Sequence, residues 1–335
     1  MKQIIKRILP EKAKKIILKF IDKRNLKKAY KLDLKRFTKC GFDLVKKSNK
    51  ENLEAKIILY YHSLEKGLSN INFRYGFGER AYKQLIASMQ EYFNKNYDLR
   101  STAYRTGLSV LREYVRKHEK TNIDTNYIQK NLDILSNYDS ISDLGGIYII
   151  NKDEVVANSK SDFKLLTSNR YSVRDYDKNP IDIELINDAL NLAKRTPSVC
   201  NRQPWHSHII KDKNLINQVL IVQGGFKGYG HNIDTLILIC SNNNYLANYT
   251  ERNQGFTDSG MYAMSLIYAL QYFGLATCAL NANLSFEGDH KVRSLLSIPD
   301  NQNLVMFISV GNYEDTFKVT KSAREDIKAK TTYHN

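Results

Sequence analysis

Two stretches decide the fold of this chain: Asn169–Tyr176, which reads NRYSVRDY, and Thr196–Trp205, which reads TPSVCNRQPW. The first carries Arg170 and Arg174 four residues apart, with the hydroxyl of Ser172 between them. The second is rich in turn residues and ends in the only tryptophan. Arginine forms charge-assisted, often bidentate hydrogen bonds to phosphate, and side-chain amides can meet the edge of a heterocycle. Together the stretches predict a site for a phosphate-bearing aromatic ligand.

Further predicted helices, strands and basic residues follow the first of these stretches along the sequence. Asp182 is suited to cap a helix, because apolar residues recur at helical spacing directly after it. The pieces that come next are a short apolar strand at His208–Ile210, a helix over Asp258–Gly274 that ends in Gly-Leu-Ala-Thr, a strand at Leu304–Val310 with Gly311 after it, and the basic residues of Lys321–Arg324.

In this order, the pieces over roughly 163–328 resemble the nitroreductase family of FMN-dependent oxidoreductases. The resemblance implies an α+β fold, in which helices flank a mixed, mostly antiparallel sheet. It also implies a homodimer. We therefore expect three parts: a basic amphipathic helical arm over residues 1–50, a mainly helical domain over 51–160 that matches no known pattern, and a nitroreductase-like FMN domain over 161–330.

The resemblance gives the basic residues their expected roles. Arg170 would meet the FMN phosphate, with Ser172 donating beside it. Arg174 would lie at the pyrimidine edge of the flavin, where a cation stabilises the reduced anion and raises the reduction potential. Arg324 and Lys321 match the late basic pair that closes on the phosphate in this family. The alternative for all four basic residues is ordinary surface charge.

The turn-rich stretch resembles the loop that meets the flavin across the dimer interface. The expected contacts from the partner subunit are Pro197, Ser198, Asn201 and Gln203. We interpret Trp205 as a core or interface anchor and Cys200 as a buried, inert thiol.

The expected reaction is ping-pong electron transfer from NADH or NADPH, through FMN, to an electron-poor acceptor such as a nitroaromatic or a quinone, or to a dedicated substrate. No catalytic side chain and no metal site is predicted. The histidines lack metal-ligand spacing, and hydride transfer to a flavin needs stacking geometry and no protein nucleophile. The rival hypothesis is a protein that docks on a membrane or partner and carries a redox-silent flavin-binding domain.

Composition indicates a cytoplasmic protein. The four cysteines have no C-x-x-C spacing, which argues against a disulfide framework or a zinc site and favours reduced thiols. No apolar stretch is long enough for a signal segment or a membrane span.

Positive charge is concentrated at the N-terminus. Residues 1–50 hold 18 Lys and Arg against 4 Asp and Glu, a net charge of +14, whereas the whole chain carries +16. Isoleucines at near-helical spacing lie on both sides of Pro10, which could start a second helix. Residues 1–36 could therefore bind an anionic membrane surface, placing the protein peripherally at the inner face of the membrane. Alternatively, this stripe packs on the protein itself. Nucleic acid is disfavoured, because few base-reading side chains accompany the lysines.

Residues 51–160 carry helical stripes, including Leu85, Ile86 and Met89, but no chemical motif. The polar residues His62, Glu65 and Arg74 are interpreted as capping and turn residues, or alternatively as residues that reach over the flavin and shape substrate access. The glycine-rich run Gly224–Gly230 lacks the spacing of a dinucleotide cradle and is expected to form a mobile loop near the substrate opening.

Overall fold

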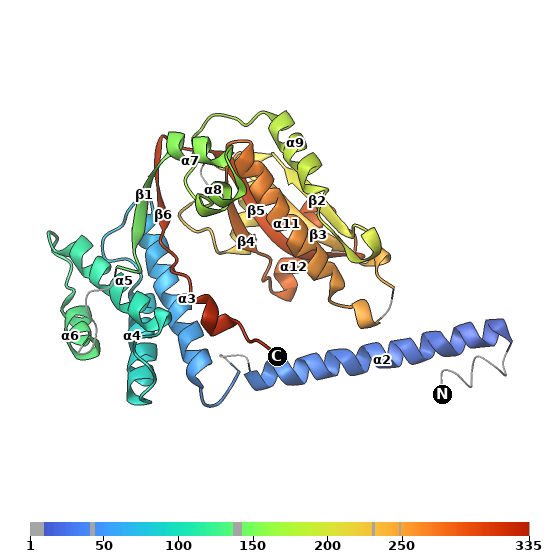
Figure 1. Ribbon diagram of the computed structural model, residues 1–335, viewed down its shortest axis with the longest axis horizontal. Helices are drawn as coiled ribbons and strands as arrows, with labels where there is room; N and C mark the ends of the chain where they lie inside the picture. The colour runs from blue at the N-terminus through green and yellow to red at the C-terminus, as the bar shows by residue number, and fades with distance from the viewer. Residues whose placement is uncertain (1–9, 41–43, 137–142, 230–231, 248, 335) are drawn as a thin grey trace.

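The computed structural model describes residues 10–40, 44–136, 143–229, 232–247 and 249–334. Within this part, the N-terminal third is helical and the remainder is an α+β domain, as Figure 1 shows. The first isoleucine group, before Pro10, lies outside the described residues. None of the described helices is both long and apolar enough to cross a membrane.

The described residues of the N-terminal region form a series of helices. They are α2 (Glu11–Cys40), α3 (Lys50–Ser69), α4 (Glu79–Asn94), α5 (Thr102–His118) and α6 (Asn126–Leu135). The predicted start of α2 after Pro10 is confirmed. Helices α3 to α6 share one core. The predicted stripe of α4 is confirmed as well, because Leu85, Ile86 and Met89 are fully buried there.

The C-terminal region is built on a four-stranded sheet with the order β2-β3-β5-β4, and every pairing is antiparallel. The strands are β2 (Trp205–Ile210), β3 (Thr235–Asn242), β4 (Leu275–Asn281) and β5 (Gln302–Asn312). The expected mostly antiparallel sheet is therefore confirmed. One strand boundary was wrong: Gly311 lies inside β5 rather than after it. The ring of Tyr176 covers Gly311, where a β-carbon would be only 2.5 Å from the ring, so only glycine fits.

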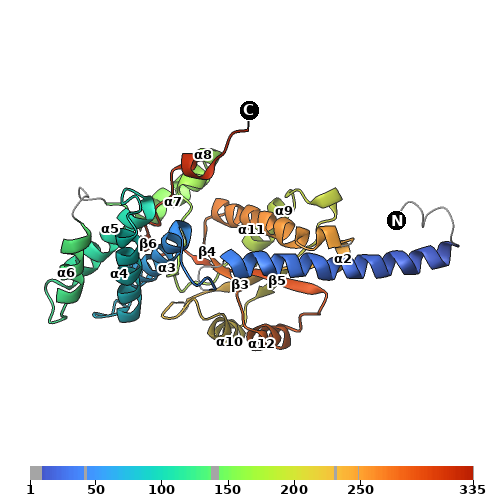
Figure 2. The same cartoon turned by 90° about the horizontal axis from the view of Figure 1, so that it is seen from below.

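Helices cover both faces of this sheet (Figure 2). Helices α9 (Ile183–Ala193) and α11 (Gln254–Tyr272) share a core with alternate residues of β3, such as Ile237 and Ile239. The β3 residues between these, such as Leu238, point to the other face of the sheet. There they pack in a second cluster with residues of α10 (Lys213–Gln223) and α12 (Phe286–Leu296). This alternation follows from the two-residue period of a strand. Asp182 caps α9 as predicted, accepting from the backbone N–H of Glu184. The start of α11 lies four residues before the predicted Asp258.

A two-stranded ribbon connects the helical region to the sheet domain. Strand β1 (Ile147–Asn151) pairs antiparallel with β6 (Thr316–Thr320), and α3 lies beside β6 (Figure 1). Short helices α7 (Lys152–Ser159) and α8 (Phe163–Ser168) follow, and the 3-10 turn η4 (Ile327–Lys330) lies near the C-terminus. Val155, which precedes the predicted domain boundary at residue 160, packs in the core of the sheet domain. The boundary itself stays a prediction.

Candidate functional site

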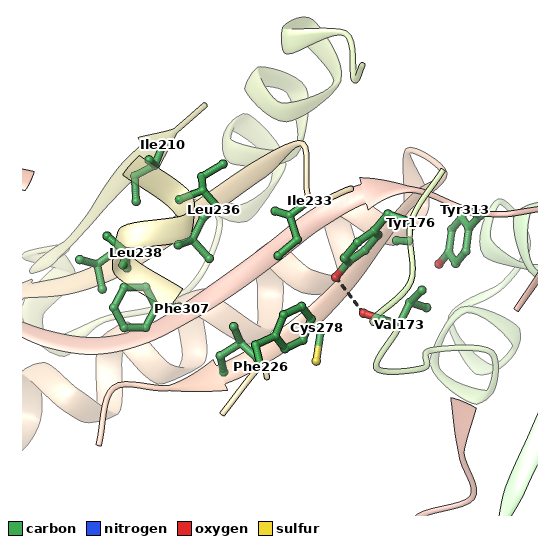
Figure 3. Packing of buried hydrophobic residues seen from close by; sticks show 14 of the residues in the cluster. Val173, Tyr176, Ile210, Phe226, Ile233, Leu236, Leu238, Cys278, Phe307 and Tyr313 are labelled. Atoms are coloured by element: carbon green, nitrogen blue, oxygen red, sulfur yellow. Dashed lines mark hydrogen bonds between the residues drawn. The ribbon is translucent and has the colours of Figure 1, made fainter. Parts of the chain in front are cut away.

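The opening segment Asn169–Tyr176 lies along the sheet domain at the start of β4. The backbone N–H of Val173 donates to the carbonyl oxygen of Thr277 at 2.9 Å. The hydroxyl of Tyr176 donates to the Val173 carbonyl oxygen at 2.8 Å and lies 2.7 Å from Ser309 Oγ (Figure 3). These hydrogen bonds hold the backbone of the segment that bears Arg170, Ser172 and Arg174, the residues predicted to contact the phosphate and the flavin.

Three cations lie near enough to the buried thiol of Cys278 to act on it electrostatically. Burial raises the pKa of Cys278, and the positive charges of Arg174, Lys66 and Arg170 oppose that shift. A hydrogen bond from Ser172 acts in the same direction as the cations. The structure therefore brings together the three predicted residues of the opening segment. It adds Lys66 from the end of α3, a cation that sequence reasoning did not select.

Arg174 and Lys66 are cations in a mainly buried setting. The side chain of Arg174 is only 9% exposed, yet in the described part of the chain its one hydrogen bond runs from Nη1 to the Ser172 carbonyl oxygen, at 3.3 Å. Burial lowers the pKa of Lys66, and the neighbouring charge of Arg174 lowers it further. A guanidinium has five N–H donors. The unused donors suit an anionic ligand such as a phosphate or the electron-rich edge of a flavin.

Asp175 is the carboxyl group beside this cluster. Burial raises the pKa of Asp175 to about 6, even though Lys318 and Arg174 favour its charged form. Near neutral pH the carboxylate therefore offsets part of the positive charge of Arg174.

The two late basic residues lie in different surroundings. Lys321 Nζ lies 2.5 Å from the Asp143 carboxylate and 5.1 Å from the centre of the Tyr148 ring, so its ammonium faces the helical region. Arg324 is exposed and donates from Nη1 to the Ser322 carbonyl oxygen at 2.5 Å. The phosphate roles of both residues stay predictions.

The turn-rich stretch forms the 3-10 turn η1 (Val199–Asn201). Ser198 Oγ accepts from the Gln203 backbone N–H at 2.9 Å, and a carboxylate oxygen of Asp258 accepts from the Val199 N–H at 3.2 Å. The side chain of Asn201 lies outside the described residues. Pro197 is exposed on the same turn. The flavin contacts predicted for this stretch stay predictions.

The same stretch holds Cys200 and Trp205, for which the sequence also raised expectations. Cys200 is exposed, with a left-handed φ of 50°, so the expectation of a buried thiol was wrong. Cys200 lies in the middle of the short turn η1 and belongs to none of the described apolar clusters. Trp205 stacks on Tyr262 with ring centroids 4.8 Å apart and an interplanar angle of 5°, which confirms its role as an anchor.

One protomer holds the two predicted flavin-binding stretches at opposite ends of β3. Thr235 and Thr277 both pair with Val310, which places the opening segment at that end. Trp205, which closes the turn-rich stretch, pairs with Ser241 at the other end. Six residues of strand separate the two ends, which is about 20 Å.

A cavity of about 570 Å³ lies between the end of α3 and the glycine-rich loop. Arg74 and Lys66 line it from the helical region, and Gly224–Tyr229 line it from the sheet domain. Glu65 is not among its lining residues. This side chain is fully buried and accepts from the Gly146 backbone N–H at 3.1 Å. The sequence offered the alternative that polar residues of the helical region shape substrate access. Of these residues, Arg74 lines the cavity, whereas Glu65 forms a buried hydrogen bond to the backbone.

Comparisons with known proteins show which proteins this chain is similar to. Residues 167–225 and 217–312 match the sequence model of the nitroreductase family. A 4-nitrobenzoate reductase from a Nocardioides species (strain LMS-CY) is 25% identical, over 46% of this chain and 81% of that protein. Among solved structures, an FMN-dependent nitroreductase from Clostridium difficile R20291 is 19% identical, with a TM-score of 0.41 over 51% of this chain and 98% of the other. A nitroreductase family protein from Clostridium novyi NT is 18% identical, with a TM-score of 0.41 over 46% and 87%.

Proposed function

We propose that this protein is an oxidoreductase that uses FMN to pass electrons from NADH or NADPH to an electron-poor acceptor. The match of residues 167–225 and 217–312 to the model of the nitroreductase family supports this proposal. When bound, FMN supplies the redox chemistry, accepting a hydride from the nicotinamide and releasing electrons to the acceptor in a ping-pong cycle. Nitroaromatic and quinone-like compounds are the acceptors to test first, and one relative is named a 4-nitrobenzoate reductase.

The observation that carries this proposal is the buried side chain of Arg174, most of whose donors are unused in the described part of the chain. Arg170 and Lys66 add positive charge near the same buried thiol, Cys278. We infer that Arg170 and Ser172 hold the FMN phosphate and that Arg174 lies at the pyrimidine edge. A cation at that edge favours the negative charge that reduction creates. Arg324 and Lys321 are proposed to close on the phosphate, which for Lys321 requires leaving Asp143.

We further propose that the working form is a homodimer. The separation of about 20 Å between the two stretches along β3 supports this, because both cannot surround one flavin from the same chain. The proposed contacts through Pro197, Ser198, Asn201 and Gln203 would then come from the partner subunit.

The direct test of this function is colour. The purified protein, reconstituted with FMN, should be yellow and should bleach anaerobically when NADH or NADPH is added. Addition of a nitroaromatic compound should restore the colour. A protein that retains FMN but never bleaches would support the rival hypothesis of a redox-silent docking protein.

Helix α2 supports a peripheral membrane contact as a second role. Ile16 and Phe20 are 70% and 68% exposed, and Tyr30 and Leu34 are also exposed. Their spacings of four, ten and four residues keep these side chains on one face of a helix. Lys23 and Lys27 are exposed on the same face, between Phe20 and Tyr30, so this stripe combines apolar side chains with positive charges. We propose that the stripe and its lysines bind an anionic lipid surface, where apolar burial and charge attraction act together.

A further inference from the structure

We propose that the cavity between α3 and the glycine-rich loop is an acceptor-binding site selective for an anionic acceptor. The proposal rests on the function proposed above and specifies its substrate class. The cavity is formed by two segments about 150 residues apart in sequence, Ser63–Phe77 and Gly224–Tyr229. The first segment lies outside the residues that match the nitroreductase family, so this part of the site is an addition of this chain.

The charge of the cavity lining is positive. Lys66, Arg74 and Lys227 line the cavity, and its lining residues include no Asp or Glu. Within the described part of the chain, none of the three cations has an ion-pair partner. The carboxylates of Asp175 and Glu314 line a neighbouring hollow of about 340 Å³ instead. Three cations on one cavity favour an anionic ligand. Because Arg74 and Lys227 are exposed, salt partly screens their attraction.

The remaining lining suits a ligand that is polar at one end and planar or apolar at the other. The amide side chains of Asn70 and Asn72 supply donors and acceptors, and the ring of Phe77 supplies an apolar wall. Ligand sites commonly combine an apolar surface with a few placed polar groups. A volume of about 570 Å³ admits a small substituted aromatic acid.

The cavity adjoins the cation cluster of the proposed flavin site. Lys66 belongs to both: it lines the cavity and its charge acts on Cys278 together with Arg174. The hydroxyl of Tyr229 donates to the Lys66 carbonyl oxygen and lies 3.3 Å from Ser69 Oγ. The Asn70 amide donates to the Gly228 carbonyl oxygen at 3.2 Å. These bonds tie the loop to α3, so the helical region shapes access to the redox site.

The test compares three acceptors of similar size on the FMN-loaded, full-length protein: 4-nitrobenzoate, 4-nitrophenyl phosphate and the neutral 4-nitrobenzamide. We expect one or both anions to have a kcat/KM at least about tenfold above that of the amide, since a charge-assisted contact typically contributes that much. The carboxylate and phosphate arms show which anionic group is preferred. Arg74→Gln and Lys227→Gln should each raise KM for the preferred anion about five- to tenfold, and leave KM for the amide within about twofold.

Arg80→Gln is the matched control, because Arg80 is exposed on α4 and does not line the cavity. Calorimetric binding of the preferred anion to the oxidised protein gives a readout without turnover. Anion binding that Arg74→Gln weakens, in a protein that never reduces the acceptor, would support the cavity and contradict the proposed function. Equal losses for charged and neutral acceptors would overturn the inference, as would loss of FMN from the Arg74 or Lys227 variants, because these cations would then serve the cofactor.

Discussion

The aromatic ring of Phe77 lies so close to the α-carbon of Gly67 that a β-carbon at position 67 would be 1.9 Å from the ring atom Cε2. Phe77 is buried and Gly67 lies in the last turns of α3. Both residues line the cavity proposed to bind the acceptor. This contact folds the turn after α3 back onto the helix and sets the shape of that wall.

Gly67→Ala should therefore destabilise the protein by about 1–3 kcal/mol, because an added methyl group must displace a packed aromatic ring. Thermal unfolding of the FMN-loaded protein measures the effect as a lower Tm. Gly260→Ala is the control: it lies inside α11, and a β-carbon there would meet nothing within 4 Å. That substitution should be neutral or stabilising. An unchanged Tm for Gly67→Ala would contradict the packing described here.

Arg170→Ala should weaken FMN binding about ten- to a hundredfold, because it removes a charge-assisted contact of about 1.5–3 kcal/mol. Fluorescence titration of the apoprotein with FMN measures the change in Kd. Mass analysis of the cofactor released from the wild-type protein should identify FMN rather than FAD, since no second phosphate motif is visible in the sequence. Arg195→Ala, an exposed arginine outside the cluster, should leave Kd unchanged.

The proposed dimer interface makes a separate prediction. Asn201→Asp should weaken flavin binding without unfolding the protein, because it places an anion beside the reduced ring. Light scattering of the wild-type protein should give the mass of two chains. A monomer that still holds one FMN per chain would contradict the proposal that the partner subunit completes the site.

The basic arm should bind anionic vesicles and ignore neutral ones. Each lysine near the surface contributes on the order of 1 kcal/mol before screening, so binding should fall as salt shortens the Debye length to about 8 Å. Deleting residues 1–36 should abolish co-sedimentation with vesicles and leave flavin content nearly intact.

A sharper variant of the arm is the pair Ile16→Asp and Phe20→Asp. Both side chains are exposed, so the charges should remove vesicle binding without disturbing the fold. If the full-length protein ignores anionic vesicles, or if the pair causes aggregation, the stripe serves another contact.

The raised pKa of Asp175 leads us to expect a pH-dependent difference in stability between the wild type and Asp175→Asn. Burial raises the pKa of this carboxyl from 3.8 to about 6, so the folded state holds the proton more tightly than the unfolded state. Ionisation of Asp175 therefore lowers the free energy of unfolding as pH rises from about 4 to 6, and the loss is complete above that window. Asp175→Asn should be more stable than the wild type at pH 7.5, and this advantage should vanish near pH 4. Urea unfolding at both values measures it, with the exposed Asp300→Asn as the control.

Local sequence determined much of this protein. The cap at Asp182 and the stripe of α4 were predictable, because caps and periodic apolar residues act over a few neighbouring positions. The mostly antiparallel sheet was expected from the resemblance to the nitroreductase family. The spacing of Arg170, Ser172 and Arg174 identified the cationic segment in the same way. Cys200 was the exception, since it is exposed, with a left-handed φ, rather than buried.

The tertiary structure alone decided which distant residues meet. It brings Lys66 to Arg174 and joins the end of α3 to the glycine-rich loop. It also places the turn-rich stretch at the far end of β3. Such contacts depend on how whole helices pack on a ribbon and a sheet, and no local pattern encodes them, because packing joins side chains separated by a hundred residues or more.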